Sequence, residues 1–207
     1  MDKDKLIITI GRELGSGGRS IGKLAASKLG IKYYDYEIID ETAKRSGFSI
    51  DFIEKSEQSV TNSLLYNLAL GTSYGISPYS TNEGVSLETQ LYVAQQSVIK
   101  DMAADGPCVI VGRCADHILS EYENVFKVFV YADMEYRIKR AVEKYGYNKN
   151  TAEKELKKAD KRRAAHYLTF TEQHWGNRAN YDLMINSGTL GEEKSVELIV
   201  QTAKILF

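Results

Sequence analysis

The sequence predicts an α/β fold of three layers, α/β/α, in which helices cover both faces of a parallel sheet. Short runs of apolar and β-branched residues alternate along the chain with longer stretches whose apolar residues recur at helical spacing. The strand-like runs are apolar throughout, as is typical of parallel strands that are buried on both faces. Ligands of such sheets bind at the carboxyl ends of the strands, so we expect the functional residues there.

The elements can be assigned in order from these patterns. The first strand is predicted at residues 6–10, and the helix after the following glycine-rich turn is predicted to end at Gly30, where helices favour glycine. Asn150 and Thr189, each followed three residues later by glutamate, are predicted to cap two further helices. The other predicted elements are helix 37–46, loop 71–84, helix 87–104, strand 108–112, strand 125–131, helix 134–145, a charged helix 150–166, strand 182–186 and a C-terminal helix.

Length and composition indicate a single soluble domain, residues 1–207. The chain is 43% hydrophobic and 27% charged, which is ordinary for a globular protein. No apolar run approaches the ~20 residues that a membrane span needs, and the polar N-terminus does not resemble a secretory signal. Cys108 and Cys114 are too few for a disulfide framework, and with His117 they match no standard zinc spacing. We expect a cytoplasmic protein in which both cysteines are small buried residues.

A basic segment stands out in a chain whose formal net charge is −1. Residues 137–163 contain eleven Lys or Arg residues and four acidic ones. A basic block on a near-neutral chain indicates a local anionic ligand, although a solvated helix face has the same composition. The 14 tyrosines are scattered and form no stacking platform, so we do not expect a nucleic-acid partner.

The turn after the first strand, GRELGSGGRS at 11–20, has the features of a phosphate-binding loop. Its glycines allow the backbone to curl around phosphate oxygens, and the helix that follows presents free N–H groups and the positive end of its dipole. Ser20 falls in the first helical turn, where a hydroxyl can reach a Mg²⁺ ion on the phosphates. A strand–helix connection that merely needs glycines is the alternative. The expected phosphate-binding residues are Gly15, Ser16, Gly17, Gly18, Arg19 and Ser20.

The lysine of common phosphate-binding loops is missing here. With the pattern G-x-x-x-x-G-K-[ST], Ser20 takes the hydroxyl position and Arg19 takes the lysine position. With the shorter pattern G-x-G-K-G-T, Gly18 takes the lysine position instead. In both alignments Arg12 and Arg19 are the cations available to replace the lysine.

Five segments together carry a family resemblance. These segments are GRELGSGGRSIGK, YYDYEII, VIVGRCADHIL, VFVYADMEYRIKRA and YDLMINSGTLGEEKSVELI. In this order they make the chain resemble the cytidylate kinase-like family of P-loop proteins, most strongly at 7–39 and 107–206. The resemblance implies a P-loop NTPase-type parallel sheet, a helical acceptor-side insert at about 37–105 and a helical lid at about 146–166.

The resemblance also implies a reaction, which is ATP-dependent phosphoryl transfer to a nucleoside monophosphate, with CMP or dCMP as the default acceptor and Mg²⁺ as a cofactor. Such a transfer requires neutralised charge and an in-line arrangement, and arginine forks bind phosphate oxygens in pairs. Arg113 matches the arginine of the family's Gly-Arg-Asp, whereas Cys114 replaces the aspartate and Asp116 lies two residues further on. Asp160 and Arg163 match the family's lid Asp/Arg pattern.

These arguments define the expected site. The residues expected in catalysis are Arg12, Arg19, Arg113 and Arg163, with Arg137, Arg140 and Arg162 on the lid side. Those expected to contact the acceptor are Asp35, Arg113, Asp116 and Asp160, and Ser20 is the residue expected to reach the metal. Asp35 follows the strand-like IKYY, where it could contact the acceptor or a water in the shell of the metal, and a turn-capping role explains it as well.

Two alternatives to a nucleotide kinase stay open at this point. A nucleotide-binding regulatory module without turnover would explain why both the loop lysine and the Gly-Arg-Asp acid are absent. A kinase of a non-nucleotide small molecule would keep the phosphate loop and change the acceptor pocket. The sequence does not indicate an oligomeric state.

Overall fold

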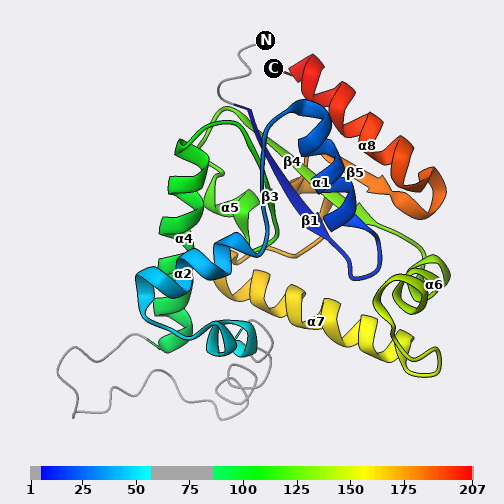
Figure 1. The fold of residues 1–207 in the computed structure, drawn as a ribbon, viewed down its shortest axis with the longest axis horizontal. Helices are drawn as coiled ribbons and strands as arrows, with labels where there is room; N and C mark the ends of the chain where they lie inside the picture. The colour runs from blue at the N-terminus through cyan, green and yellow to red at the C-terminus, as the bar shows by residue number, and fades with distance from the viewer. Residues whose placement is uncertain (1–5, 57–85, 207) are drawn as a thin grey trace.

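The computed structural model describes residues 6–56 and 86–206, so the loop predicted at 71–84 lies outside the described residues. A sheet of five parallel strands in the order β2-β3-β1-β4-β5 forms its centre (Figure 1). The strands are β1 (Ile7–Arg12), β2 (Lys32–Tyr34), β3 (Cys108–Val111), β4 (Val125–Tyr131) and β5 (Leu183–Asn186). The helices are α1 (Gly18–Leu29), α2 (Glu37–Ser46), α4 (Leu87–Ala104), α5 (Ala115–Ile118), α6 (Met134–Tyr145), α7 (Ala152–Thr171) and α8 (Ser187–Leu206), and residues 50–56 are also helical.

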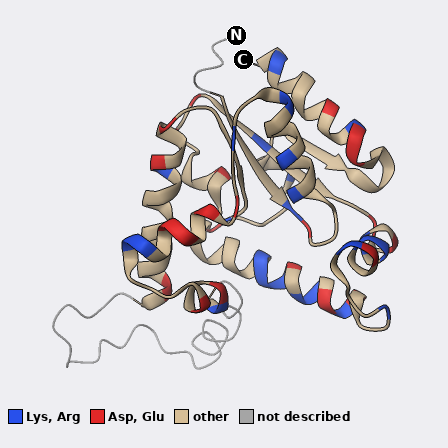
Figure 2. Ribbon diagram, viewed as in Figure 1, with Lys and Arg blue, Asp and Glu red and all other residues tan. Residues whose placement is uncertain are grey.

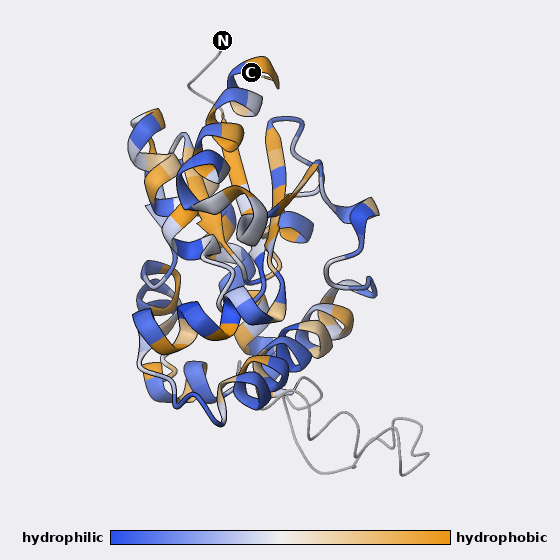
Figure 3. Cartoon of the chain, turned by 90° about the vertical axis from the view of Figure 1, so that its right-hand side faces the viewer, coloured by the Kyte–Doolittle hydropathy of each residue, from blue (hydrophilic) through white to orange (hydrophobic). Residues whose placement is uncertain are grey.

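Helices cover both faces of the sheet, which confirms the predicted three-layer fold. On one face α1 and α8 contribute Ile21 and Ile199 to a core shared with Ile8 of β1. On the other face α4 packs Ile99 against Ile110 of β3, together with α5. The strands are mainly hydrophobic and the outer helix surfaces mainly hydrophilic (Figure 3). Both cysteines are buried, as predicted.

The strand order determines where a ligand site can form. From β1 the chain builds β2 and β3 on one side of the sheet and then β4 and β5 on the other. The helix after β1 packs on one face, whereas the helix after β3 packs on the opposite face. A crevice therefore opens at the carboxyl ends of these two neighbouring strands, where Arg12 ends β1 and Gly112 follows β3.

The helix α7 lies across the carboxyl ends of the strands rather than on a face of the sheet (Figure 1). Lys and Arg gather along this helix and at the adjacent end of α6 (Figure 2). The predicted basic segment thus borders the crevice and is not merely a remote solvated surface. Among the described helices, none combines the length and the apolar character needed to cross a bilayer.

Two predicted helix starts are wrong, for the same physical reason. The Asn148 side chain accepts the N–H of Asn150 and forms a local turn, so the α7 N-cap is Thr151 and the helix continues beyond the predicted end to Thr171. At the last helix the Asn186 side chain accepts hydrogen bonds from the backbone N–H groups of Gly188 and Thr189. This earlier cap starts α8 at Ser187, and the helix is then interrupted by non-helical torsions at Gly191.

Candidate active site

A cavity of about 480 Å³ opens at the crevice between β1 and β3. Five arginines line it, namely Arg12, Arg19, Arg113, Arg162 and Arg163. The acidic groups of the lining are Glu54 and Asp116, and its aromatic residues include Trp175 and Tyr181. The positive charge and the aromatic surface suit an anionic ligand that also carries a flat apolar part.

Arg12 lies at the centre of this arrangement because two glycines leave room for its side chain. A Cβ atom at Gly18 would lie 2.5 Å from the Cβ of Arg12. A Cβ atom at Gly112 would lie 1.9 Å from the Nη1 atom of Arg12. The arginine therefore passes α1 at Gly18 and ends against the turn after β3, and both contacts require glycine. A side chain at position 18 would have to occupy the space that Arg12 takes.

The guanidinium of Arg12 is held in an unfavourable environment for a cation. Its Nε atom is buried and has no hydrogen-bond partner among the described residues. Burial, followed by repulsion from Arg163 and Arg19, lowers the pKa of Arg12 to about 9, although Asp35 opposes the shift. A bound anion would relieve both the desolvation and the repulsion, which is the expected property of an anion-binding arginine.

Asp35 joins two other arginines at the end of β2. The Nε atom of Arg19 lies 2.9 Å from the Asp35 carboxylate, and Nη1 of Arg113 donates to the Asp35 carbonyl oxygen at 2.9 Å. Arg19 also stacks over the Tyr36 ring at 4.8 Å. Asp35 therefore orients two arginines that line the cavity. The predicted turn-capping alternative is not the arrangement found, because the carboxylate bonds side chains from other elements.

The turn that carries Arg113 has an unusual backbone. Gly112, Arg113 and Cys114 have successive positive φ angles of 76°, 54° and 55°. Such torsions are costly for residues with a side chain and cluster at functional sites. Here they bring the Arg113 side chain back toward Asp35, with 6% of it exposed.

The glycine-rich loop has the predicted form. Gly15 and Gly17 adopt φ angles of 86° and 85°, and α1 begins directly after Gly17. The side chain of Ser16 turns back to donate to the Glu13 carbonyl oxygen at 2.9 Å, so this serine contributes loop geometry and its backbone rather than a free hydroxyl. The first amides of α1 have no intrahelical partner by helix geometry and face the region expected to hold phosphate.

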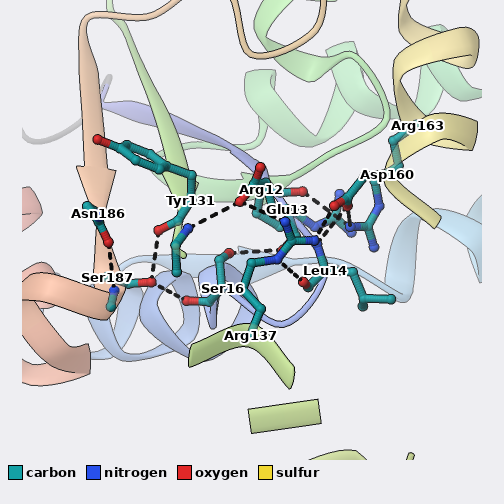
Figure 4. A network of polar contacts seen from close by, with 12 residues as sticks. Arg12, Glu13, Leu14, Ser16, Tyr131, Arg137, Asp160, Arg163, Asn186 and Ser187 are labelled. Atoms are coloured by element: carbon teal, nitrogen blue, oxygen red, sulfur yellow. Dashed lines mark hydrogen bonds and ion pairs between the residues drawn. The ribbon is translucent and has the colours of Figure 1, made fainter. Parts of the chain in front are cut away.

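A network of polar contacts fastens this loop to α6 and α7 (Figure 4). Arg137 donates through Nε to the Leu14 carbonyl oxygen at 2.8 Å, and its Nη atoms pair with Glu13 and Asp160. Asp160 in turn accepts the Leu14 N–H at 2.9 Å. Arg137 was predicted as a lid arginine for phosphate, but it belongs to α6 and all three of its nitrogens are engaged by the protein. Its role in the described structure is to fasten the loop.

Of the residues expected on the lid side, those on α7 contact either the cavity or the glycine-rich loop. Arg162 lines the cavity from α7. Arg163 donates to the Arg12 carbonyl oxygen at 3.3 Å and pairs with Asp160 at 3.4 Å. Asp160 contacts the loop and, among the described residues, is not part of the cavity wall. The structure thus brings Arg163 to the site and holds Asp160 behind it.

Arg140 approaches the glycine-rich loop from α6. Its Nη2 atom donates to the Ser20 hydroxyl at 2.8 Å and lies 2.7 Å from the Glu192 carboxylate. A Cβ atom at Gly17 would lie 3.2 Å from its guanidinium. Like Arg137, it belongs to α6 and not to the predicted lid. Unlike Arg137, it lies directly beside the start of α1.

The predicted magnesium residue fits the ion only in part. The Ser20 oxygen already accepts a hydrogen bond from Arg140, and a second cation at that oxygen would be repelled. The described residues also contain no group of three or more His, Cys, Asp or Glu side chains suited to a metal. In the described part of the chain, the Ser20 hydroxyl is thus engaged by Arg140, and no cluster of such ligands accompanies it.

Asp116 is a nearly buried acidic group of the cavity wall. It is 6% exposed and accepts the Tyr167 hydroxyl at 2.6 Å. Burial raises the pKa of Asp116, against the lowering effect of the Tyr167 hydrogen bond. The hydroxyl of Tyr181, which also lines the cavity, is buried without a hydrogen-bond partner among the described residues. Asp116 and Tyr181 are thus available to a ligand's polar groups.

A comparison of the sequence with models of protein families identifies the family of this chain. The model of the cytidylate kinase-like family matches residues 7–189. This chain belongs to the cytidylate kinase-like family. It is 24% identical over 201 residues to a protein named cytidylate kinase from Archaeoglobus fulgidus. That alignment covers 96% of this chain and 94% of the relative. It is 22% identical over 202 residues to a protein named cytidylate kinase from Methanobrevibacter smithii, and that alignment covers 97% of this chain and 100% of the relative.

Solved structures of similar shape agree with the family assignment. An uncharacterized protein from Eubacterium ventriosum has a TM-score of 0.71 at 26% identity and covers 96% of this chain and 98% of its own. A shikimate kinase from Acinetobacter baumannii has a TM-score of 0.55 at 14% identity, covering 99% and 95%, and shares the fold alone. The fold is that of P-loop kinases, and the family is one of phosphotransferases.

Several residues of this cytidylate kinase-like site were missed by the sequence patterns. Glu13 is an acidic residue inside the phosphate loop, and its charge was a usable signal. Tyr36, next to Asp35, gave none, because nothing local shows that Arg19 will stack on it. Gly112 was visible as part of Gly-Arg-Cys, but its contact with Arg12 joins positions 100 residues apart.

Proposed function

We propose that this member of the cytidylate kinase-like family transfers a phosphoryl group from ATP to a nucleoside monophosphate, with CMP or dCMP as the first candidates. The donor phosphates bind at the glycine-rich loop and the start of α1. The acceptor binds in the adjacent cavity, with its phosphate among the arginines and its base against the aromatic residues near Asp116. The family membership, the two curated relatives and the composition of the cavity support this assignment.

One observation carries the proposal, and it concerns the missing lysine. A Cβ atom at Gly18 would meet the stem of Arg12, and the Nε atom of the Arg12 guanidinium is buried without a hydrogen-bond partner among the described residues. Arg12 therefore replaces the loop lysine, in agreement with the alignment that puts Gly18 at the lysine position. A buried cation held at a cost to stability is expected at a site that binds phosphate groups.

The arginines of the site then have different roles in the transfer. Arg12 and Arg163 lie beside the transferring phosphoryl group and neutralise the charge that spreads over its oxygens. Arg113 and Arg19, fixed by Asp35, hold the acceptor phosphate in line. When α7 covers the site it excludes water, which suppresses hydrolysis of ATP. Mg²⁺ bound to the phosphate oxygens would supply further neutralisation.

The proposal is tested by measuring ADP release with a panel of acceptors. We expect release above the ATP-only background with CMP or dCMP, and weaker or no release with other nucleoside monophosphates. Shikimate, gluconate and simple alcohols serve as the non-nucleotide arm. Release with a sugar or alcohol alone would favour the kinase of a non-nucleotide. No release with any acceptor, despite measurable ATP binding, would favour the regulatory module.

A further inference from the structure

Ser187 is a buried hydroxyl that the proposed mechanism does not use. It is the first residue of α8 and has no exposed surface. Its Oγ atom lies 2.6 Å from the carbonyl oxygen of Ser16 and 3.1 Å from that of Tyr131. Figure 4 shows the hydroxyl between the loop and the end of β4. Because it has one proton, the hydroxyl shares its donation between two carbonyl groups, and the shorter contact is to the loop.

The contact with Ser16 has a consequence for the next amide of the loop. The Ser16 carbonyl and the Gly17 N–H belong to one trans peptide, so they point in opposite directions. Holding the carbonyl toward Ser187 turns the Gly17 N–H away from α8. Gly17, at φ 85°, tolerates many other torsions, so its own backbone does not fix the peptide plane.

The first half of the loop has anchors of its own. Ser16 closes the turn by donating to the Glu13 carbonyl oxygen, and the Glu13 carboxylate accepts the N–H of Ala132 at 3.2 Å. None of these contacts holds the peptide between Ser16 and Gly17. Among the described residues, the hydroxyl of Ser187 is the side-chain group that does so.

We infer that Ser187 is a positioning residue for the donor phosphates, which it never touches. It sets the plane of the 16–17 peptide and so aims an amide at the anion that binds before α1. Groups that orient a metal ligand from behind typically contribute about 10–100-fold to metal affinity, and we take the lower end of that scale for an oriented amide. The inference rests on the proposed function, because it requires the donor to bind at this loop.

The test compares two serine substitutions in the same helix. Ser195 matches Ser187 in burial, but its hydroxyl donates at 2.6 Å to Gly191 within α8. Titration calorimetry measures the Kd of ATP and of CMP for wild type, Ser187→Ala and Ser195→Ala, and thermal unfolding controls for stability. We expect Ser187→Ala to weaken ATP binding about tenfold and to leave CMP binding within twofold. Ser195→Ala leaves both unchanged.

Two results would overturn the inference, and a third concerns the proposed function. The inference is overturned if the ATP Kd of Ser187→Ala stays within twofold of wild type. It is also overturned if the loss is not specific, that is, if Ser195→Ala loses as much ATP affinity or if Ser187→Ala loses as much CMP affinity. If wild type itself does not bind ATP, the proposed function fails instead. Should Ser187→Ala not fold, Ser187→Cys keeps a similar volume with a much weaker donor and replaces it in the same comparison.

Discussion

At the scale of single residues, the buried charge of Arg12 lowers the stability of the unliganded protein. Its pKa of about 9 means that the charged form is destabilised in the folded protein. The resulting loss of stability is complete below pH 9 and disappears as the pH rises from 9 toward the ordinary arginine value of 12.5, because the folded state then releases its proton before the unfolded state does. In the proposed function, a bound anion offsets this loss of stability.

Arg12→Met should therefore stabilise the unliganded protein. An uncharged side chain of similar length removes the desolvation cost, so we expect a gain on the order of 1 kcal/mol at pH 7, or about 2–4 °C in Tm. ATP should stabilise wild type and not the variant. Thermal unfolding with and without ATP measures both effects. A lower Tm for unliganded Arg12→Met would show that Arg12 is an ordinary stabilising residue.

A glycine pair tests whether the position of Arg12 matters. In Gly112→Ala the new Cβ displaces the Arg12 guanidinium, and ATP binding should fall at least ~10-fold, since misplacement by 1 Å is costly in such sites. Gly30→Ala is the control, because Gly30 also has a positive φ, of 68°, but a Cβ there meets nothing within 4 Å. Both variants carry the backbone strain, and only the first moves Arg12. Equal ATP affinity in the two would contradict the role of this contact.

At the scale of elements, α6 fastens the loop through a buried arginine. Arg137→Met would leave the carboxylates of Glu13 and Asp160 without their shared partner, and such losses in buried pairs cost about 3 kcal/mol or more. Arg45→Met is the control, because Arg45 pairs with Glu41 and Asp101 at the exposed surface, where ion pairs contribute little. Urea unfolding measures both. A small effect for Arg137→Met would mean that the network is not a structural fastening.

The helix α7 should move as a lid only in part. Residues 152–163 meet the loop through Asp160 and Arg163, whereas residues 164–171 are anchored by the Tyr167 bond to Asp116 and by Phe170 stacked on Tyr92. We expect hydrogen exchange of 152–163 to be fast without ligand and slow with ATP and CMP, and exchange of 164–171 to be slow in both. Equal protection of 152–163 in both states would argue for a static helix.

At the scale of the whole molecule, local patterns were enough to predict the fold and many of its boundaries. The predicted helices 37–46, 87–104 and 134–145 and the strand 125–131 coincide with α2, α4, α6 and β4. Gly, Pro or Asp residues mark their ends, and the apolar residues of α2 and α6 recur at helical spacing. The starts of α7 and α8 were wrong because an asparagine two or three residues earlier captured the local amides.

The site was predicted less completely, because its decisive contacts join distant parts of the chain. The arginines could be named from their residue type and position. The course of the Arg12 side chain depends on its contact with Gly112, and the orientation of Arg137 depends on its contact with Asp160 in another helix. Neither contact leaves a trace in the spacing of residues along the sequence.

The central claim is that Arg12 acts as the cation of the phosphate loop, and a single-turnover rate measurement tests it most directly. Arg12→Ala and Arg19→Ala are each compared with wild type, with ATP and the acceptor that the screen identifies. We predict that Arg12→Ala slows transfer at least ~100-fold, the scale of one lost electrostatic donor, and that Arg19→Ala mainly raises the acceptor KM. An unchanged rate for Arg12→Ala would contradict the account.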